Sequence, residues 1–421
     1  MSTTVESNPM APAQGAQSPA YRTRLIRFVA LSWGFCAFFP VGVMYLHLLL
    51  MSLAMVMTPD LADRVRVLRA SPLVPPLLLM LTWTLLAALV GGMFPDLPTR
   101  LFHVFRVVLV LCLALMLTRE EARHALLGLL VGALFASALV AAHHAWGLPD
   151  WAIWRSLVAP HNNFSSGNMM TMAIAAGVAL CLAFRLGAGN RWLALAAAIV
   201  LGSTVALHAV SRNAQVLLLL APMAAIVCRF RSWRDVLAGS VLLAALVVLA
   251  WQLSPTIERR FAEITSNLHT MIVESRYNTS IGVRWRMDEE AFAAMMEQPV
   301  FGQGVGSWAP RWTRVWAQLD QQLPLDESNR FAEINNPHND FLLAGMETGV
   351  PGMLIVLWLF WRLIRIGWQQ RNTAGSITFM MAVSIAASTM VNAPLRDAAL
   401  GMTLLWLLGA SVAAHPEKPI D

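Results

Sequence analysis

A polar stretch, NNPHNDFLLAGMETGVPG at residues 335–352, interrupts a chain that is otherwise rich in apolar residues. Asn336 can cap a helix and Pro337 suits a first helical turn, so we predict that His338 lies in the first turn of a short helix. The positive end of a helix attracts anions and disfavours imidazolium. This stretch therefore predicts a neutral His338 that can accept a proton beside a bound anion such as diphosphate.

Arginines in polar connections are the second chemical feature. Arg212 lies in AVSRNAQ, a short connection between two apolar segments, and Arg284 and Arg286 open a helical stretch further along. A guanidinium can hold phosphate oxygens through two parallel hydrogen bonds and stays charged at any relevant pH, so it can replace a divalent metal at a diphosphate. Simpler interpretations stay open: Arg212 can anchor the chain at the membrane interface, and Arg284 can pair with Asp288 on a solvated face.

Several further residues are secondary candidates for the same site. Asn339 directly follows the central histidine, and Arg106 shares a helix face with His103 near one end of an apolar segment. His161 and Asn163 lie in PHNNFSSGNM, at the start of another apolar segment. This last stretch is either a helix cap with an interfacial turn or part of the wall of the same cavity.

Trp308, Trp312 and Trp316 repeat at four-residue spacing and therefore share one helix face. One interpretation is a helix at the membrane surface with its indoles at headgroup depth. The other is an aromatic shelf for sugar rings, and the two are compatible. The preceding FGQGVGSW contains GxGxG, but no strand comes before it, so a tight turn that returns the chain to the membrane is favoured over a nucleotide site.

Asp288, Glu289 and Glu290 form a cluster of metal-like ligands. Consecutive residues on a helix point about 100° apart, so these three side chains cannot close on one ion. We therefore expect no metal unless another segment contributes ligands. We also expect no cofactor.

The composition excludes an ordinary soluble domain. Hydrophobic residues make up 57% of the 421 and charged residues 13%, which indicates a membrane protein with several spans. The net charge of +6 comes almost wholly from arginine, and we interpret it as a sign of membrane topology rather than of nucleic-acid binding. The four cysteines lie in or beside apolar segments and suggest no disulfide framework.

We predict about twelve membrane spans, because a span needs roughly 20 apolar residues. The apolar segments are 24–40, 41–58, 73–92, 99–117, 123–146, 166–184, 192–210, 213–228, 234–253, 350–366, 375–393 and 395–413. The first two flank Pro40 and can instead be one kinked helix, which would invert the orientation of everything downstream. With the N-terminus inside, arginines cluster in alternate loops, and this asymmetry predicts that both termini are cytoplasmic.

The predicted domain organisation follows from these spans. Residues 1–23 form a disordered cytoplasmic tail without the features of a signal peptide, and residues 24–253 hold nine spans. Residues 254–349 form one large loop on the outer face. The last three spans occupy residues 350–413, and residues 414–421 form a second cytoplasmic tail.

The large loop is expected to be helical. Apolar residues at 257, 261, 264 and 268 with charges between them predict an amphipathic helix. A second helix, VRWRMDEEAFAAMMEQ, should stop before Pro299, because a residue that precedes proline disfavours helical geometry. Gly349 and Pro351 should end the helix that contains His338.

Three segments together resemble the bacterial O-antigen ligase and polymerase superfamily. They are SRNA in a short outer loop, Arg284 followed by PVFGQG, and HNDFLLAGMETGVPG, which is similar to the family's His-Asn…Leu…Glu-x-Gly-x-x-Gly signature. The layout, with about twelve spans and one large periplasmic loop before the histidine helix, is also similar. The motifs cover a minor part of the chain, and the layout covers nearly all of it.

The resemblance implies an O-antigen ligase: an all-α, GT-C-like glycosyltransferase of the bacterial inner membrane that is inverting, metal-independent and active at the periplasmic face. Its donor would be a glycan on undecaprenyl diphosphate and its acceptor lipid A–core, with membrane lipids around it. Arg212 and Arg284 would bind the diphosphate, and His338 would be catalytic. Arg286 departs from the strongest part of the pattern, so which neighbouring arginine points inward stays open. The oligomeric state, a monomer included, also stays open.

Alternative functions remain at this point. O-antigen polymerases and protein O-oligosaccharyltransferases share these motifs, but a chain that ends soon after its last span offers no extra domain for a protein acceptor, which favours the ligase. A secondary transporter would also have many spans. Transporters, however, place polar sites near mid-membrane on broken helices, whereas here the candidate site lies at one face.

Overall fold

The computed structural model describes residues 20–147, 163–209, 211–230, 232–234, 236–241, 244–245, 255–274, 277, 279–320, 334–370 and 372–415. Within these ranges all regular secondary structure is helical, which confirms the predicted all-α class. The predicted tail before residue 20, the residues after 415 and His161 lie outside the described residues.

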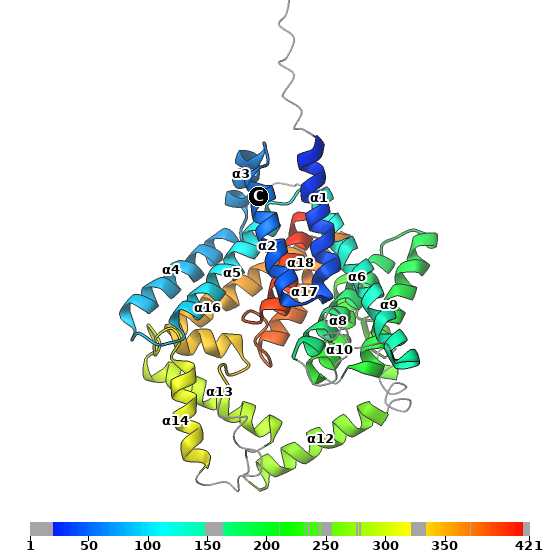
Figure 1. Ribbon diagram of the computed structural model, residues 1–421. Helices are drawn as coiled ribbons and strands as arrows, with labels where there is room; N and C mark the ends of the chain where they lie inside the picture. Colours follow the sequence, from blue (N-terminus) through cyan, green and yellow to red (C-terminus); the bar gives the residue numbers. More distant parts are fainter. Residues whose placement is uncertain are drawn as a thin grey trace, which may run out of the picture.

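The helices that follow the apolar segments pack into one bundle (Figure 1). They are α1 (Ala20–Phe35), the short 3-10 helix η1 (Cys36–Phe38), α2 (Val41–Val56), α3 (Leu61–Ala70), α4 (Val74–Val90), α5 (Leu97–Leu115), α6 (Arg119–Trp146), α8 (Asn163–Ala183), α9 (Ala188–His208), α10 (Arg212–Arg229), α16 (Asp340–Gln369), α17 (Thr373–Thr389) and α18 (Ala398–Ala413). The large loop holds α12 (Pro255–Ile272), α13 (Ser280–Glu297) and α14 (Trp308–Asp320). The two helices expected in this loop from sequence, α12 and α13, are confirmed.

Five helices of the described chain are long and apolar enough to cross a membrane: α5, α6, α9, α10 and α16. A sixth span is possible if α2 and α3, which are bent by 109°, count together. Four further apolar helices are shorter, and a helix of 17 residues covers only about 25 Å of a hydrocarbon core that is about 30 Å thick. The chain is a multi-pass membrane protein, but the expected number of about twelve spans is not confirmed.

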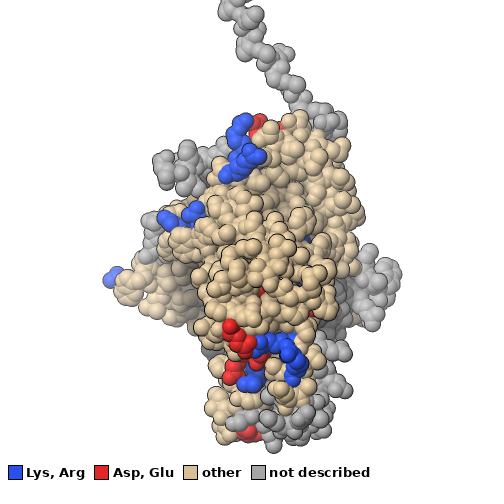
Figure 2. All heavy atoms as spheres, turned by 90° about the vertical axis from the view of Figure 1, so that its left-hand side faces the viewer, with Lys and Arg blue, Asp and Glu red and all other residues tan. Residues whose placement is uncertain are grey.

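The bundle and the large loop occupy different levels of the molecule. In Figure 1, α12, α13 and α14 lie at one end, away from the start of α1 and from the C-terminus. Figure 2 shows a face on which charged side chains gather mostly toward the two ends, with a broad band of uncharged residues between them. Exposed leucines of α4, among them Leu78, Leu85 and Leu89, are what a surface in contact with lipid requires.

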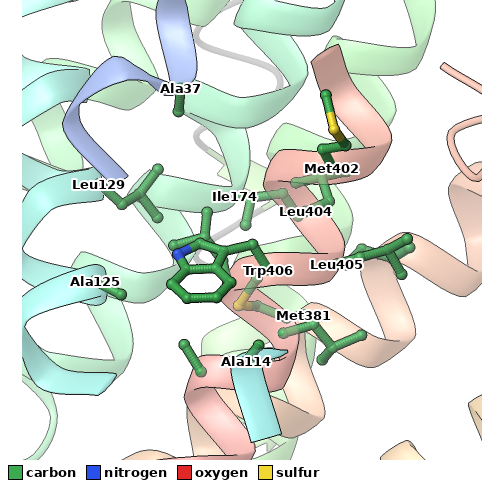
Figure 3. Close-up of a cluster of buried hydrophobic side chains, with 14 of the residues drawn as sticks. Ala37, Ala114, Ala125, Leu129, Ile174, Met381, Met402, Leu404, Leu405 and Trp406 are labelled. Carbon is green, nitrogen blue, oxygen red and sulfur yellow. The ribbon is translucent and has the colours of Figure 1, made fainter. Parts of the chain in front are cut away.

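The core of the bundle lies around α18, which is buried at every residue from Leu400 to Ser411. Trp406 is surrounded by apolar side chains from several helices (Figure 3). Its indole stacks on that of Trp33, with ring centroids 4.3 Å apart and planes 5° from parallel. A helix enclosed on all sides is a fixed support for the turn that precedes it, and that turn reaches the candidate site.

The turn at residues 298–307 packs against a kink in α16. Gly349 has φ 77° and breaks the helix there, as the sequence predicted for the end of the short helix, although α16 resumes and continues to Gln369. The Val350 N–H donates to the Pro299 carbonyl at 2.8 Å, and the Gln303 N–H donates to the Met346 carbonyl at 2.7 Å. The preferred interpretation of the glycine-rich FGQGVGSW segment as a tight turn is confirmed.

The three tryptophans of α14 form a buried stack instead of a surface row. Trp308 and Trp312 are 0% exposed and Trp316 is 4% exposed, and they pack against α13 and α16. The indole N–H of Trp308 donates to the Ile334 carbonyl at 3.0 Å. Buried rings can contact neither lipid headgroups nor sugars. The same four-residue spacing serves helix packing equally well.

Candidate functional site

His338 lies two residues before α16 and not in its first turn, as the sequence had suggested. Asn339 is the N-cap, because its side-chain oxygen accepts the Leu342 N–H at 3.2 Å. Asn336 instead accepts the N–H of His338 at 2.9 Å and closes a local turn. His338 has φ 56°, a left-handed conformation that is uncommon outside glycine and that surrounding contacts must hold in place.

The carbonyl of Asn335 is the point at which these contacts converge. Nη2 of Arg100 donates to it at 2.6 Å, and Nη1 of Arg396 donates to it at 2.7 Å. Arg100 is itself fixed by a buried ion pair in which its Nε lies 3.0 Å from Oε1 of Glu347. The backbone before His338 is therefore tied to α5, to α16 and to the turn between α17 and α18.

Arg284 and Arg286 point to different sides of α13. Residues two apart on a helix are separated by about 200°, so only one of them can face the bundle. Arg284 lines a cavity with His338. Arg286 donates through Nη1 to Oε2 of Glu289 at 2.5 Å, and its guanidinium carbon lies 5.5 Å from the centroid of the Tyr277 ring. The arginine that points inward is therefore Arg284.

The three consecutive carboxylates on α13 have three different surroundings. Glu289 pairs with Arg286, and Oε1 of Glu290 accepts from Nε of Arg311 at 2.5 Å. Asp288 is the member that turns toward the site. This divergence agrees with the helical geometry that argued against a shared ion.

Asp288 connects α13 to the segment that carries His338. Burial raises the pKa of Asp288 to about 6, while a hydrogen bond with Asn339 and the charge of Arg284 act in the opposite direction. At neutral pH this carboxyl is therefore mostly ionised and moderates the positive charge of Arg284.

Arg212 is the first residue of α10 and lies close to Arg284. Its Nη2 is 3.2 Å from Oε2 of Glu263 on α12. Its neighbours Ser211 and Asn213 line the cavity, although Arg212 is not among the lining residues. After burial, the Arg212 charge is the next cause of the lowered pKa of Arg284, so the two cations share one electrostatic environment.

The turn between α17 and α18 forms another part of the cavity wall and contributes Asn392 and Arg396. Oδ2 of Asp340 accepts the Leu395 N–H at 2.9 Å. Arg106, a secondary candidate from the sequence, is buried behind the turn and donates through Nη2 to the Arg396 carbonyl at 2.7 Å. Arg106 thus holds the backbone of the turn and does not line the cavity.

A cavity of about 340 Å³ joins these segments. Its polar lining includes His103, Ser211, Arg284, His338, Asn392 and Arg396. The structure thus brings together two of the sequence candidates, Arg284 and His338, with Arg212 nearby. Trp308 and Trp312 do not line the cavity, and the side chain of Asn163 is outside the described residues.

A second, mostly apolar cavity of about 90 Å³ lies next to the first, between α4, α5 and α16. His103 and Arg396 line both cavities. The two cavities are therefore neighbours, one mostly polar and one mostly apolar.

The imidazole of His338 is neutral at neutral pH. Burial is the largest cause, and the charge of Arg284 adds to it, so the pKa of His338 falls to about 4 even though a hydrogen bond with Asn392 opposes the shift. Its Nδ1 is buried and has no hydrogen-bond partner within the described chain. A neutral imidazole beside two cavity-lining arginines can accept a proton next to a bound anion.

Comparison with known proteins agrees with this arrangement. Residues 197–357 match a family model described as O-antigen ligase. The match supports membership of the O-antigen ligase superfamily. Within that superfamily segment lie Arg212, Arg284 and His338, whereas the turn between α17 and α18 comes after it. No curated protein matches the chain.

Two residues of this cavity were missed from sequence, Asn392 and Arg396. One signal was available: VNAPLRDA is a short polar connection between apolar segments, and its arginine resembles Arg212 in that respect. The signal was weak because an isolated arginine at a helix end is usually an interfacial anchor.

Proposed function

We propose that this chain is an O-antigen ligase that transfers a glycan from undecaprenyl diphosphate to a sugar hydroxyl of lipid A–core. The family match supports this class of enzyme. The observation that carries the proposal is that Arg284 and a neutral His338, from separate segments, line one cavity. A guanidinium and an uncharged base side by side are the parts that transfer from a diphosphate donor requires.

The reaction would occur at the periplasmic face of the bacterial inner membrane, with both termini in the cytoplasm. In support, α12, α13 and α14 lie at the end of the bundle opposite to the start of α1 and to the C-terminus (Figure 1). Long loops cross membranes largely regardless of their charge, so the arginines of this loop do not oppose the orientation.

In the proposed mechanism His338 is the general base. Its low pKa leaves the imidazole with a free lone pair for the proton of the acceptor hydroxyl. The hydroxyl oxygen attacks the anomeric carbon of the glycan while its proton moves to His338. Base assistance of this kind contributes about 100- to 10,000-fold to a rate.

The leaving group departs as the new bond forms. The bond between the anomeric carbon and the diphosphate oxygen breaks, and undecaprenyl diphosphate takes the bonding electrons. Attack from the opposite face inverts the configuration. Arg284 holds the diphosphate through charge-assisted hydrogen bonds, Arg212 adds positive charge from α10, and no metal is needed.

Donor binding would also prepare the base. A pKa of about 4 makes His338 a weak proton acceptor in the empty site, and the Arg284 charge is one cause of that value. A bound diphosphate offsets this positive charge, so the pKa of His338 rises toward the pH at which the reaction runs. The base then becomes strongest when the donor is present.

The adjoining cavities fit a donor that is both anionic and lipid-linked. The larger cavity is lined by arginine, histidine and asparagine, and the smaller one is mainly apolar. A diphosphate in the first would leave the start of a polyprenyl chain beside the second.

Reconstitution tests the proposal directly. The purified full-length protein, carrier-linked glycan and purified lipid A–core are combined, and glycan-capped lipopolysaccharide is measured on gels. We expect product both with and without EDTA. Loss of product on chelation that magnesium restores would contradict the metal-independent mechanism.

A deletion strain separates the related activities of the superfamily. Loss of a ligase leaves rough lipopolysaccharide while long glycan accumulates on its lipid carrier. Caps of a single repeat would indicate a polymerase instead, and unchanged lipopolysaccharide would indicate a protein O-oligosaccharyltransferase. Movement of a small solute into sealed vesicles without glycan transfer would support a transporter.

A further inference from the structure

Arg396 lines the cavity but has no role in the function proposed above. It lies in the turn between α17 and α18, after the end of the segment that matches the O-antigen ligase family. It reaches the same cavity as Arg284 and His338 from a different part of the chain. The cavity therefore has a cation that the family match does not include.

The side chain of Arg396 is not what holds this turn in place. Oδ2 of Asp340 accepts the N–H of Leu395, and Arg106 donates to the carbonyl of Arg396. Asp397, which also lines the cavity, accepts the backbone N–H three residues ahead and caps α18. Because these contacts involve the backbone of the turn or other side chains, the guanidinium of Arg396 is not needed to hold the turn itself.

The charge of Arg396 is only partly compensated. Its Nη1 donates to the Asn335 carbonyl at 2.7 Å, while its Nε is buried without a hydrogen-bond partner. Within the described ranges no carboxylate forms an ion pair with Arg396, in contrast to Arg100, which pairs with Glu347. A half-buried guanidinium whose Nε is buried without a partner favours an anionic ligand.

We propose that Arg396 binds the phosphate groups of the donor as a further arginine beside Arg284 and Arg212. This inference rests on the proposed function and adds a residue from outside the matched segment. The donor diphosphate is doubly ionised and gains negative charge as the glycosidic bond breaks, so one guanidinium compensates only part of it. Arg396 is already oriented, because its turn adjoins the buried helix α18.

A binding experiment that does not depend on glycan transfer tests this role. Geranylgeranyl diphosphate is titrated into the full-length protein in nanodiscs without divalent metal, and its dissociation constant is measured by calorimetry. We expect Arg396→Ala to weaken binding by about 10- to 100-fold, as loss of hydrogen bonds to a charged group predicts. Arg396→Lys keeps the charge but loses the planar fork, so its affinity should lie between those of Arg396→Ala and the unsubstituted protein.

A matched control is Arg314→Ala, because Arg314 is exposed on α14 and its Nε donates only to the Pro310 carbonyl. This variant should bind the probe like the unsubstituted protein. Thermal unfolding of each variant shows whether the fold is retained, and we expect Arg396→Ala and Arg396→Lys to remain folded because other side chains hold the turn.

The outcomes separate this proposal from the function on which it rests. Equal binding by folded Arg396→Ala and the unsubstituted protein would overturn the role of Arg396 and leave the ligase proposal intact. Equal binding together with a raised KM for lipid A–core in the transfer assay would overturn the donor assignment. It would assign Arg396 to a phosphate of the acceptor instead. Weakened binding in a protein that transfers no glycan would support the phosphate site and contradict the ligase function.

Discussion

Arg284 and His338 line one cavity, where burial first and the Arg284 charge second lower the pKa of His338 to about 4. The residue proposed to bind the anion and the proposed base are thus electrostatically coupled. A change in the charge of either side chain, or the arrival of an anion between them, must alter the proton affinity of the imidazole.

Replacement of His338 by asparagine should abolish transfer without disturbing the loop. Asparagine tolerates the left-handed backbone of this position better than most residues, so His338→Asn removes the base but keeps the turn. We expect a loss of about 100- to 10,000-fold in turnover with unchanged prenyl diphosphate binding. The measurement is glycan transfer by the purified variant. Turnover by His338→Asn close to that of the unsubstituted protein would exclude His338 from the mechanism.

The pH dependence of turnover should differ between the free and the donor-bound enzyme. In the free enzyme His338 is protonated only below its pKa of about 4, so kcat/KM should stay level as the pH falls and drop near pH 4. A bound diphosphate offsets the Arg284 charge and raises this pKa, so the acid limb of kcat should lie at higher pH. If kcat and kcat/KM fell at the same acidic pH, the donor would not change the proton affinity of His338.

Substitution of the two neighbouring arginines on α13 should give unequal results. Arg284→Ala removes a cation from the cavity, so we expect donor affinity to fall by about 10- to 100-fold. Arg286→Ala removes only an ion pair with the exposed Glu289 and should change affinity little. Titration of a prenyl diphosphate into both proteins tests this. The reverse order of effects would contradict the orientation of α13.

Substitution of Gly349 should damage the fold at the kink of α16. A Cβ at this position would lie 2.1 Å from the carbonyl oxygen of Val300, and the residue has φ 77°. We expect Gly349→Ala to cost about 1–3 kcal/mol or more and to lower the melting temperature. Gly42→Ala is the control, because nothing lies within 4 Å of its Cβ and alanine suits the interior of a helix. Equal melting temperatures for the two variants would contradict the packing at the kink.

Local patterns in the sequence predicted the elements around the site well. The end of α13 before Pro299, the turn over FGQGVGSW and the break at Gly349 all follow from residues whose preferences act over short distances. The sequence also named Arg284 and His338 as candidates, and the structure places both at one cavity. Each of these predictions depends only on residues that are close together in the sequence.

Distant contacts explain where the predictions were wrong. Asn336 and Asn339 can both cap a helix, but the neighbouring Asn335 carbonyl is held by Arg100 of α5 and by Arg396 of the turn between α17 and α18. A sequence pattern contains no information about such a contact.

The tryptophans of α14 and the number of spans show the same limit. A row of indoles fits a membrane surface and a helix interface equally well, and only the packing against α13 and α16 decides that Trp308 and Trp312 are buried. Likewise, an apolar segment gives the position of a helix more reliably than its length, and length decides whether it qualifies as a span.

The segment that matches the O-antigen ligase family is not a self-sufficient module. Its residues supply His338 and Arg284 to the cavity, but the lining also includes a turn that follows residue 357 and rests on the central helix of the bundle. A chimera that exchanged only the matched region with a relative would combine one protein's base with another protein's turn. Compatibility between the two halves, and not the signature motif alone, would then decide whether the hybrid works.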